Sequence, residues 1–454
     1  MQFTAVQNQT IYALATPYGK SGVAVLRISG PMAVKILADL GYERVPTPRS
    51  TVYCKFIDRA ANEIIDHGLF IYFQGPHSFT GEDVVELHVH GGIAVIKHFM
   101  KVLGNLPYLR PAEAGEFSKR AFLNDKFDLT MAEGLVDLIN AETEVQKKVA
   151  LRQYGGVLER LYDSWRNQIL QGLARIEAYI DFPEEDIPEE EVIAAVKAAH
   201  SIAEDVAKHL HSNPTAELIA EGLHIAIFGP PNAGKSSLLN WLASKEVAIV
   251  SDIPGTTRDV LQVRLELNGM LAIFYDTAGL RESTEDSIEQ KGITKALAVL
   301  AGADLKILVL DSANQQQAQE FLVTHQSIID DNTICLLNKS DIVLSSQNLL
   351  AVPNARNVVA ASLTTNQGLE QFMSLLQSAI GDNHYQADVP LITKARYRKA
   401  LQDCYSALLI DATQPLDLIA EGMRDAAWHI GSITGKIGVE EVLDVVFSTF
   451  CIGK

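Results

Sequence analysis

The chain has 454 residues, about three times a typical domain of roughly 150 residues, so two to four domains are expected. With 47% hydrophobic and 21% charged residues, it falls outside the disordered and collagen-like classes. Its 38 basic and 56 acidic residues give a net charge of −18, which excludes a polycationic protein that coats nucleic acid non-specifically.

The charges are unevenly distributed along the chain. Residues 181–191 contain seven acids and no base, whereas residues 97–175 contain twelve bases and ten acids. A polyanion is therefore expected to dock on the middle region, if anywhere.

The four cysteines form no CxxC pair, which favours a reducing compartment over a disulfide or zinc framework. The first ten residues lack a basic segment followed by an apolar core, and no apolar run is long enough to span a bilayer. We expect a soluble, cytoplasmic protein with no membrane partner.

The first third of the chain predicts a compact α+β domain over residues 1–120. Its apolar and polar residues alternate in short runs that Gly and Pro separate. These runs are Thr10–Ala15, Val23–Ile28, Leu69–Phe73 and Val84–Val89.

From about Asp128 the apolar residues recur with helical spacing, through Ile139 and again from Leu158 to Leu173. After the acidic stretch, Val192–His211 predicts another helix, and the chain is helical again from Lys394 to its end. The simplest arrangement joins residues 121–215 and 382–454 into one helical domain around an insertion.

The insertion, residues 216–381, alternates apolar strands with helical stretches, which predicts an α/β domain. Within it, Leu265–Tyr275 carries Asn268-Gly269 between two alternating runs. That pattern is typical of a tight β-hairpin inside an otherwise parallel sheet.

The strand HIAIF leads into Gly229-Pro-Pro-Asn-Ala-Gly-Lys-Ser236 and then into a helical run. This is the GxxxxGKS phosphate-binding loop in its strand-loop-helix setting. Its glycines let backbone amides surround phosphate oxygens, Lys235 meets the β- and γ-phosphates, and Ser236 meets a magnesium ion.

Two further motifs follow at predicted strand ends. Asp276-Thr-Ala-Gly279 can hold magnesium through water and contact the γ-phosphate. Asn338-Lys-Ser-Asp341 offers a carboxylate that can accept both the ring N–H and the exocyclic amine of guanine, a pair that adenine lacks. Ser362-Leu-Thr364 stands where a last base-contacting loop is expected, although it matches the usual SA[KL] poorly.

Three motifs in this order predict a Ras-like GTPase domain with Thr256 or Thr257 as a switch hydroxyl. Leu280 stands where small GTPases place a water-orienting glutamine, so hydrolysis needs another group. The candidates are Arg281, a carboxylate within 282–289, and a monovalent cation near Asn232.

The segments GPPNAGKSSLLN, SDIPGTTRDV, DTAGLRE, NKSD and the final CIGK resemble the MnmE (TrmE) family of tRNA modification GTPases. The similarity also covers SGVAVLRISG, SFTGEDVVELHVHGG and EFSKRAFLNDKFDL in the first third. It implies a multidomain α/β protein with an N-terminal folate-binding and dimerisation domain, a central helical domain and an inserted GTPase domain.

The resemblance also implies an activity and partners. Members act as homodimers with the flavoprotein MnmG, in a heterotetramer. They add an aminomethyl or carboxymethylaminomethyl group at C5 of the wobble uridine of certain tRNAs. The one-carbon unit comes from 5-formyltetrahydrofolate or another tetrahydrofolate derivative.

For the nucleotide site, the resemblance implies potassium ligation by Asn232, Ser251, Ile253 and Thr256, and magnesium ligation by Ser236 and Thr257. The family's catalytic glutamate aligns with Glu289, with Glu285 as the alternative. Together with the motifs above, the predicted GTP-binding residues are Asn232, Ala233, Gly234, Lys235, Ser236, Ser237, Ser251, Thr256, Thr257, Asp276, Thr277, Ala278, Gly279, Asn338, Lys339 and Asp341.

For folate, the resemblance points to Arg27, Glu86, Lys126 and Lys454. Cationic groups suit the glutamate tail of folate, and a carboxylate suits the adjacent N–H groups of the pterin. Cys451 is a candidate nucleophile, because a thiolate that adds to C6 of uracil activates C5. An inert buried thiol is the alternative reading.

His88 and His90 share one strand face, but no third metal ligand is evident, so a core or folate-lining role is expected. Two rival functions fit the GTPase motifs: a ribosome- or RNA-assembly switch without base chemistry, and a one-carbon transferase in which GTP is only regulatory. An assembly factor should tolerate deletion of Gly453-Lys454, whereas a modifying enzyme should lose its product and keep GTP hydrolysis.

Overall fold

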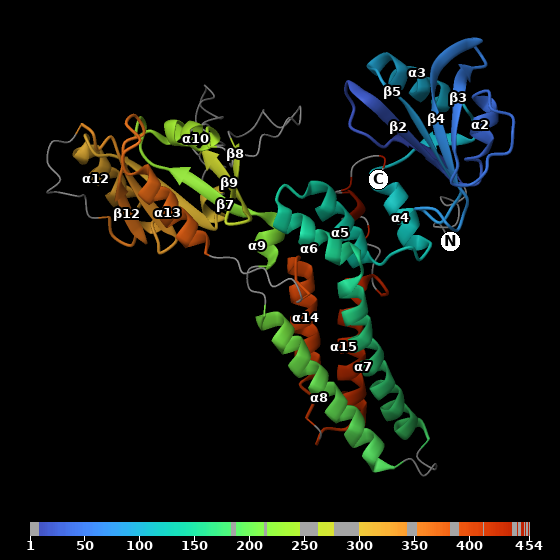
Figure 1. The fold of residues 1–454 in the computed structure, drawn as a ribbon. Helices are drawn as coiled ribbons and strands as arrows, with labels where there is room; N and C mark the ends of the chain where they lie inside the picture. Colours follow the sequence, from blue (N-terminus) through green and yellow to red (C-terminus); the bar gives the residue numbers. More distant parts are fainter. Residues whose placement is uncertain are drawn as a thin grey trace. The chain divides into compact units, whose positions relative to one another are not determined.

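The computed structural model describes residues 9–182, 188–212, 216–245, 262–276, 299–342, 352–381, 390–411 and 413–437, together with 443, 446–448, 450 and 453. The chain divides into two compact units (Figure 1). Unit 1 comprises residues 1–136, 151–209 and 398–454, and unit 2 comprises residues 137–150 and 210–397. None of the helices in the described parts of the chain combines the length and apolarity needed to cross a bilayer.

The N-terminal sheet of unit 1 has six strands in the order β3-β4-β5-β2-β1-β6. Neighbouring strands are antiparallel except β1 and β6, which run parallel. The strands are β1 (Thr10–Leu14), β2 (Ser21–Ser29), β3 (Thr51–Asp58), β4 (Glu63–Phe73), β5 (Val84–Gly91) and β6 (Leu109–Pro111). The strands expected from the alternating sequence in this region are confirmed.

Helices cover one face of this sheet. The helices α2 (Lys35–Asp39) and α3 (Ile93–Gly104) bury their apolar side chains against alternate residues of the strands, because successive strand residues point to opposite faces. On the opposite face, Phe117 of α4 (Glu116–Leu123) packs with Ile11 and Ala13 of β1. Much of that second face remains partly exposed along β2 and β5.

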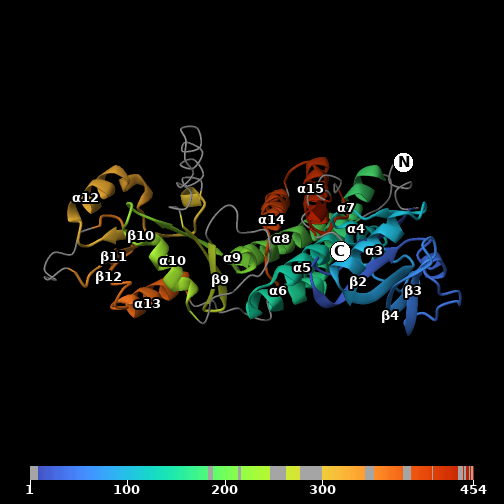
Figure 2. The same cartoon turned by 90° about the horizontal axis from the view of Figure 1, so that it is seen from above.

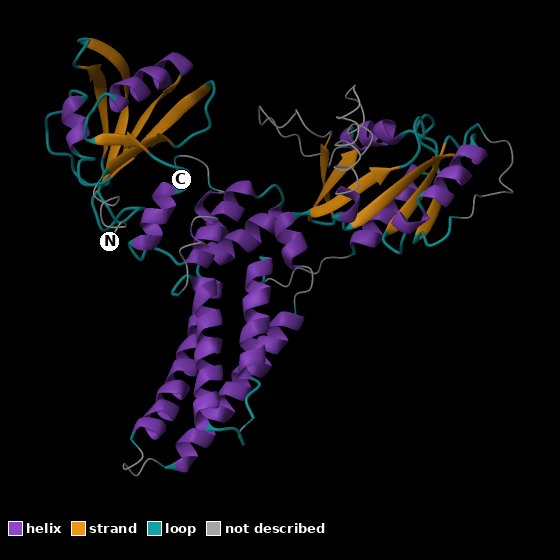
Figure 3. Cartoon of the chain, turned by 180° about the vertical axis from the view of Figure 1, so that it is seen from behind, coloured by secondary structure: helices purple, strands orange, loops and turns teal. Residues whose placement is uncertain are grey.

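Long helices make up the rest of unit 1. The helices α7 (Val157–Asp181) and α15 (Leu416–Thr434) lie side by side (Figure 3). They run antiparallel, because Lys436 Nζ lies 2.6 Å from Asp163 Oδ2 near one end and Arg424 Nη2 lies 2.7 Å from Glu177 Oε1 near the other. The remaining helices of this region are α5 (Leu129–Asn140), α6 (Glu144–Tyr154), α8 (Glu189–His211) and α14 (Ala395–Leu408), and each of these four carries residues of both units.

The sheet of unit 2 also has six strands, in the order β12-β11-β10-β7-β9-β8. All neighbours are parallel except the edge strand β8, which is antiparallel to β9. The strands are β7 (Leu223–Phe228), β8 (Gln262–Leu267), β9 (Met270–Asp276), β10 (Leu305–Asp311), β11 (Thr333–Asn338) and β12 (Asn357–Ala360). This is the strand order of Ras-like GTPase domains, so the predicted fold class is confirmed.

The predicted hairpin is also present between β8 and β9. Asn268 and Gly269 have φ angles of 51° and 79°, which is the left-handed backbone that a two-residue type I′ turn requires.

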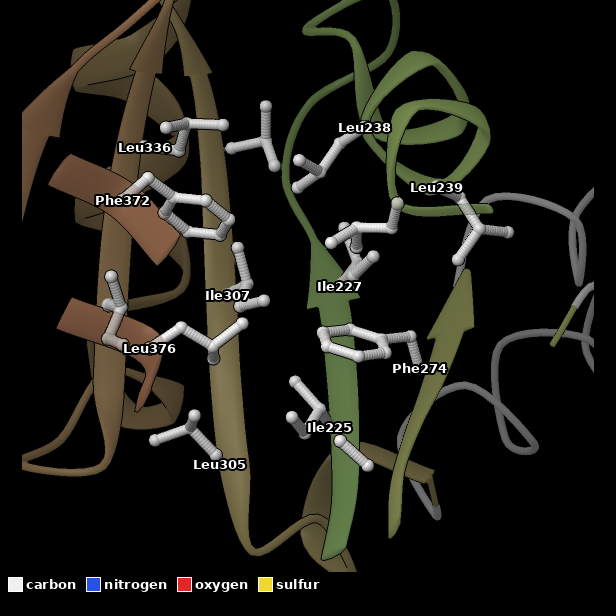
Figure 4. Close-up of a cluster of buried hydrophobic side chains, with 14 of the residues drawn as sticks. Ile225, Ile227, Leu238, Leu239, Phe274, Leu305, Ile307, Leu336, Phe372 and Leu376 are labelled. Carbon is white, nitrogen blue, oxygen red and sulfur yellow. The ribbon is translucent and has the colours of Figure 1, made fainter. Parts of the chain in front are cut away.

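Helices cover both faces of the parallel sheet. Leu238 and Leu239 of α10 (Lys235–Ala243) and Phe372 of α13 (Leu369–Ile380) pack on one face (Figure 4). On the other face, Ala318 and Leu322 of α12 (Gln315–Thr324) pack against the sheet, and Figure 2 shows α12 and α13 on opposite sides. Two short helical segments complete the described elements of this unit, α9 (Ala216–Glu221) and η2 (Gln326–Ile328).

Burial on both faces explains why these strands are almost continuously apolar in sequence. It also leaves the strand ends as the place where polar groups can gather. The loops after β7, β9 and β11 all leave from the same edge of the sheet, because those strands are parallel.

Candidate functional site

The loop after β7 is shaped by backbone constraints that its glycines satisfy. Gly229 has φ 147°, and a Cβ built on it would lie 2.1 Å from the carbonyl oxygen of Val309. Gly234 has φ 108°, and its Cβ would lie 2.2 Å from Asn338 Nδ2. Larger residues would clash at both positions, so the loop can lie against the sheet edge only with glycine there.

The cation and hydroxyl of the loop have fixed partners. Lys235 is buried, and its Nζ donates to the carbonyl oxygens of Gly229 and Pro230 at 3.0 and 2.8 Å. Ser236 Oγ donates to Asp276 Oδ2 at 2.8 Å. Asp276 is fully buried at the end of β9, so the structure brings together the two groups predicted to manage magnesium.

The chemistry of this pair suits a hard divalent cation, which prefers hydroxyl, carboxylate and water oxygens. Ser236 lies at the first turn of α10, where unpaired backbone N–H groups and the helix dipole favour a phosphate. The donor set therefore fits a magnesium-bound nucleotide phosphate.

The segment Asn338–Asp341 begins at the end of β11. Asn338 is buried; its Nδ2 donates to the Ala233 carbonyl oxygen at 2.9 Å, and its Oδ1 accepts from the Leu363 N–H at 3.2 Å. Asn338 thus ties the phosphate-binding loop to the loop after β12. The carboxylate of Asp341 is exposed two residues beyond Lys339 and is available to a base.

One residue of this site, Asp311, was not singled out from the sequence, whereas Ser362 belongs to the segment expected as a last base-contacting loop. Asp311, at the end of β10, lies 2.6 Å from Lys339 Nζ and fixes that side chain. Ser362 Oγ accepts from the N–H groups of Thr364 and Thr365 at 3.3 and 3.1 Å, which shapes the loop that presents Leu363 to Asn338. The position of Asp311 at the end of an apolar strand was the available signal for it.

Several predicted nucleotide-site residues lie outside the described residues. They are Ser251, Ile253, Thr256, Thr257, Thr277, Ala278, Gly279, Leu280, Arg281, Glu285 and Glu289. Ser237, in the first turn of α10, and Asn232, with φ 61°, are described and exposed. The potassium, switch and catalytic-glutamate assignments therefore stay predictions.

A second candidate site lies on the open face of the N-terminal sheet. Arg27 of β2 and Glu86 of β5 are register partners, and Arg27 Nε donates to Glu86 Oε1 at 2.9 Å. The guanidinium carbon also lies 5.3 and 5.8 Å from the ring centres of Phe79 and Phe117. The two predicted folate residues thus form a pair flanked by aromatic rings, which the sequence did not reveal.

The other predicted folate residues have different surroundings. Lys126 Nζ donates to the carbonyl oxygen of Pro76, in the same loop that carries Phe79. Lys454 and Cys451 lie outside the described residues, whereas Gly453 is described and its carbonyl oxygen accepts from Arg27 Nη1 at 3.4 Å. Gly453 therefore lies at the Arg27–Glu86 pair.

A buried ion network joins α4 to the loop that precedes β5. Arg120 donates to both carboxylate oxygens of Glu82 at 3.1 and 3.0 Å and to Glu116 Oε1 at 2.9 Å. Burial alone would raise the pKa of Glu116, but hydrogen bonds from Arg110 and Arg120 hold that pKa below its ordinary value. Glu116 is therefore ionised at neutral pH, and the network keeps α4 against the sheet.

Histidines and cysteines add no further site in the described ranges. There, no group of three His, Cys, Asp or Glu side chains is placed to hold a metal ion, and His88 Nε2 lies 3.6 Å from Glu86 Oε2. Burial raises the pKa of the Cys54 thiol to about 11 and of the Cys335 and Cys404 thiols to about 12. These three cysteines are protonated at neutral pH and are poor nucleophiles.

Comparison with known proteins gives a consistent result along the whole chain. The family model of the MnmE helical domain matches residues 129–451, and that of the GTP-binding protein TrmE N-terminus matches residues 10–126. The tRNA modification GTPase MnmE of Parvibaculum lavamentivorans is 44% identical over 451 residues, covering 98% of this chain and 100% of the relative. The MnmE of Rickettsia bellii is 42% identical over 447 residues, with the same coverage.

Solved structures resemble part of the chain. The G domain of the T. maritima FeoB iron transporter is 26% identical, covering 35% of this chain and 98% of that domain, with a TM-score of 0.27. An S. thermophilus NFeoB mutant bound to GDP is 19% identical, covering 50% of this chain and 95% of that protein, with a TM-score of 0.26. At these scores the likenesses add nothing to the fold assignment, which rests on the strand order.

Proposed function

The chain belongs to the MnmE family of tRNA modification GTPases, and on that premise we propose that it is a potassium-activated GTPase of tRNA wobble-uridine modification. With the flavoprotein MnmG, it adds an aminomethyl or carboxymethylaminomethyl group at C5 of the uridine. The one-carbon unit comes from 5-formyltetrahydrofolate or another tetrahydrofolate derivative.

One observation carries the nucleotide half of the proposal: Lys235, the Ser236–Asp276 pair and Asn338 converge at the carboxyl edge of the parallel sheet. Lys235 neutralises the β- and γ-phosphates, and the amides of residues 233–237 bind the phosphate oxygens. Ser236, together with Thr257, would hold magnesium, which neutralises charge between the β- and γ-phosphates, and Asp276 would orient its water ligands.

We assign recognition of the nucleotide's base to the loop after β11. Asp341 accepts the ring N–H and the exocyclic amine of guanine, as the sequence motif predicts. Asn338 is already bonded to Ala233 and Leu363, so its task is to hold the base loop against the phosphate loop. The structural support for guanine recognition is therefore the exposed Asp341 on a loop that Asn338 and Lys339 fix.

Hydrolysis requires positive charge near the phosphates and a group that orients the attacking water. The side chain of Leu280 supplies neither. We assign potassium to Asn232, Ser251, Ile253 and Thr256, where a monovalent cation offsets charge that develops at the β–γ bridge. Asn232 is an exposed residue of the phosphate-binding loop, where a second GTPase domain of a homodimer can face it. Glu289, or Glu285 in its place, orients the attacking water.

Folate is assigned to the open face of the N-terminal sheet. Glu86 accepts the adjacent N–H groups of the pterin, Arg27 and Lys126 bind anionic groups, and the rings of Phe79 and Phe117 provide flat apolar contacts. The contact between Gly453 and Arg27 supports a role for the neighbouring Cys451 and Lys454 at the same place. Cys451 would add to C6 of the uracil ring and leave after C5 has been modified.

The proposed partners are a second copy of the chain, MnmG and tRNA, and the proposed location is the cytoplasm. The test is GTP turnover in potassium against sodium at equal ionic strength. We expect GTP turnover to require potassium. We also expect the turnover rate per molecule to rise with protein concentration as dimers form. Equal turnover in both salts would contradict the potassium assignment, and absence of turnover in either would contradict the GTPase itself.

A further inference from the structure

The β8–β9 hairpin connects the nucleotide edge of unit 2 with the start of α6. At one end, β9 delivers Asp276 to Ser236. At the other end, Gly269 of the turn lies against Val145, which is in the first turn of α6. The 7 residues of β9, at about 3.3 Å per residue, span about 20 Å between these points.

Two contacts join the hairpin to this segment. A Cβ built on Gly269 would lie 3.0 Å from Val145 Cγ2, so the turn backbone is in contact with that side chain. Arg264 Nη1 of β8 donates to Glu142 Oε1. This ion pair is partly buried, with side-chain exposures of 35% for Arg264 and 22% for Glu142, so water screens it less than a surface pair.

Glu142 is held in place by the capping box of α6. Gln146 Oε1 accepts from the N–H groups of Glu142 and Thr143 at 3.0 and 3.1 Å, and Thr143 Oγ1 accepts from the Gln146 N–H at 3.2 Å. Gln146 Nε2 also donates to the carbonyl oxygen of Ala220 in α9 at 3.3 Å. A force on Glu142 therefore acts directly on the first turn of α6.

The other partner, Arg264, lies on an edge strand of the sheet. Among the described strands, β8 pairs only with β9, whereas residues 272–276 of β9 also pair with β7. In the chain, β8 directly follows residues 246–261, which contain the predicted switch residues Ser251, Thr256 and Thr257. Arg264 is the third residue of β8 and is the register partner of Ile273 in β9, three residues before Asp276.

Loss of the ion pair would leave a buried carboxylate without its cation. Glu142 Oε2 is buried and makes no hydrogen bond among the described residues. Displacement of Arg264 would leave this carboxylate buried without its cation, which is costly, so the start of α6 must rearrange to hydrate it.

From these observations we propose that the Arg264–Glu142 pair is the contact by which the nucleotide state sets the order of the first turn of α6. This inference rests on the proposed GTPase function. Arg264 is a positioning residue in this scheme, because it touches neither nucleotide nor substrate. The same helix continues beyond Ala150 into residues of unit 1.

Hydrogen exchange of the full chain, with GDP and with a non-hydrolysable GTP analogue, tests the proposal. We expect amides of residues 142–150 to exchange at rates that differ about tenfold between the two nucleotides. Arg264→Gln should abolish that difference and leave the affinity for both nucleotides unchanged. Lys306→Gln, on β10 of the same sheet, is the matched control. It breaks the ion pair between Lys306 and Asp330 and should preserve the difference in exchange rate between the two nucleotides.

A charge swap separates coupling from general damage. Arg264→Glu and Glu142→Arg should each abolish the difference, and the double variant should restore it. If Arg264→Gln does not fold, Glu142→Gln, which keeps the size and a hydrogen-bond acceptor, takes its place. A difference that persists in these variants, or no difference in the wild type with both nucleotides bound, would overturn the proposal. Failure of the wild type to bind guanine nucleotides would instead refute the proposed function.

Discussion

The two six-stranded sheets of this molecule place their candidate sites differently. The parallel sheet of unit 2 is covered by helices on both faces, and its polar groups gather at the carboxyl edge. The antiparallel sheet of unit 1 is covered by α2 and α3 on one face, and Arg27 and Glu86 lie in mid-strand on the other. The way in which strands are connected thus decides whether chemistry sits on loops or on a sheet face.

The difference has a mechanical consequence. Arg27 and Glu86 are register partners in a ladder, so their distance is fixed by the sheet itself. Ser236 and Asp276 meet where a loop leads into a helix and where a strand ends, and such segments can rearrange with a ligand. We therefore expect a preformed folate site and an adaptable nucleotide site, and the following changes test that contrast.

The largest effect is expected at the edge of the parallel sheet. Lys235→Ala removes the cation that meets the phosphates and should lower GTP turnover by about 10²–10³-fold. Folate binding on the other sheet should not change. Lys245→Ala, at the far end of α10, removes a cation that lies over Trp241 and serves as the control. Normal turnover in Lys235→Ala, measured by phosphate release, would contradict the site.

A smaller effect should follow from Asp341→Asn. Loss of two hydrogen bonds to a charged acceptor should weaken GTP binding about 10–100-fold. The new amide can donate to the oxygen that xanthine carries in place of the guanine amine, so binding of xanthosine triphosphate should improve. Titration with both nucleotides checks this, and unchanged preference for GTP would place base recognition elsewhere.

On the antiparallel sheet, Arg27→Ala should lower the affinity for 5-formyltetrahydrofolate about tenfold and leave potassium-dependent GTP turnover intact. The exposed pair Arg59–Glu43 in the same domain offers Arg59→Ala as a control. Equilibrium binding by fluorescence or calorimetry gives the affinity. An equal loss of folate affinity in Arg27→Ala and Arg59→Ala would indicate a damaged domain rather than a lost ligand contact.

The smallest effect concerns the stability of unit 1. Burial, reinforced by the charge of Arg398, lowers the pKa of His209 to about 4, while Tyr162 hydrogen-bonds its ring. As pH falls below the ordinary histidine pKa of about 6.5, the unfolded chain takes up a proton that the folded chain refuses, so stability falls.

The loss should amount to about 1 kcal/mol between about pH 7 and pH 5.5. His209→Phe should remove that part of the pH dependence, and denaturant unfolding of both proteins at each pH measures it. An identical pH dependence in the two proteins would show that His209 is protonated in the fold.

The fold followed from the sequence where apolar periodicity was strong. The hairpin predicted over Leu265–Tyr275 extends over Gln262–Asp276, because the polar residues of an edge strand hide its start. The helix α6 gave no apolar stripe, and only the pattern Thr143-x-x-Gln146, a capping box, could have marked its beginning. The helical segment expected from Lys394 onward is divided into α14 and α15, with Pro415 as the N-cap of α15.

The candidate sites could be predicted from the sequence less completely than the fold. Motifs named Ser236, Asp276 and Asn338, and the structure brings them together. Asp311 and Phe79 were missed, because their roles depend on contacts between strands or loops far apart in the chain. Arg27 and Glu86 came from family resemblance alone, since the register of β2 and β5 cannot be read from either strand.

The central claim is that this chain couples a guanine nucleotide at one sheet edge to one-carbon chemistry on a tRNA uridine. Mass analysis of wobble nucleosides in cells that lack the chain, and in the same cells with the chain restored, tests it most directly. We expect C5 of the wobble uridine to be unmodified in cells without the chain. The modification should return with the wild type and not with Lys235→Ala. An unchanged nucleoside profile in cells without the chain would contradict it.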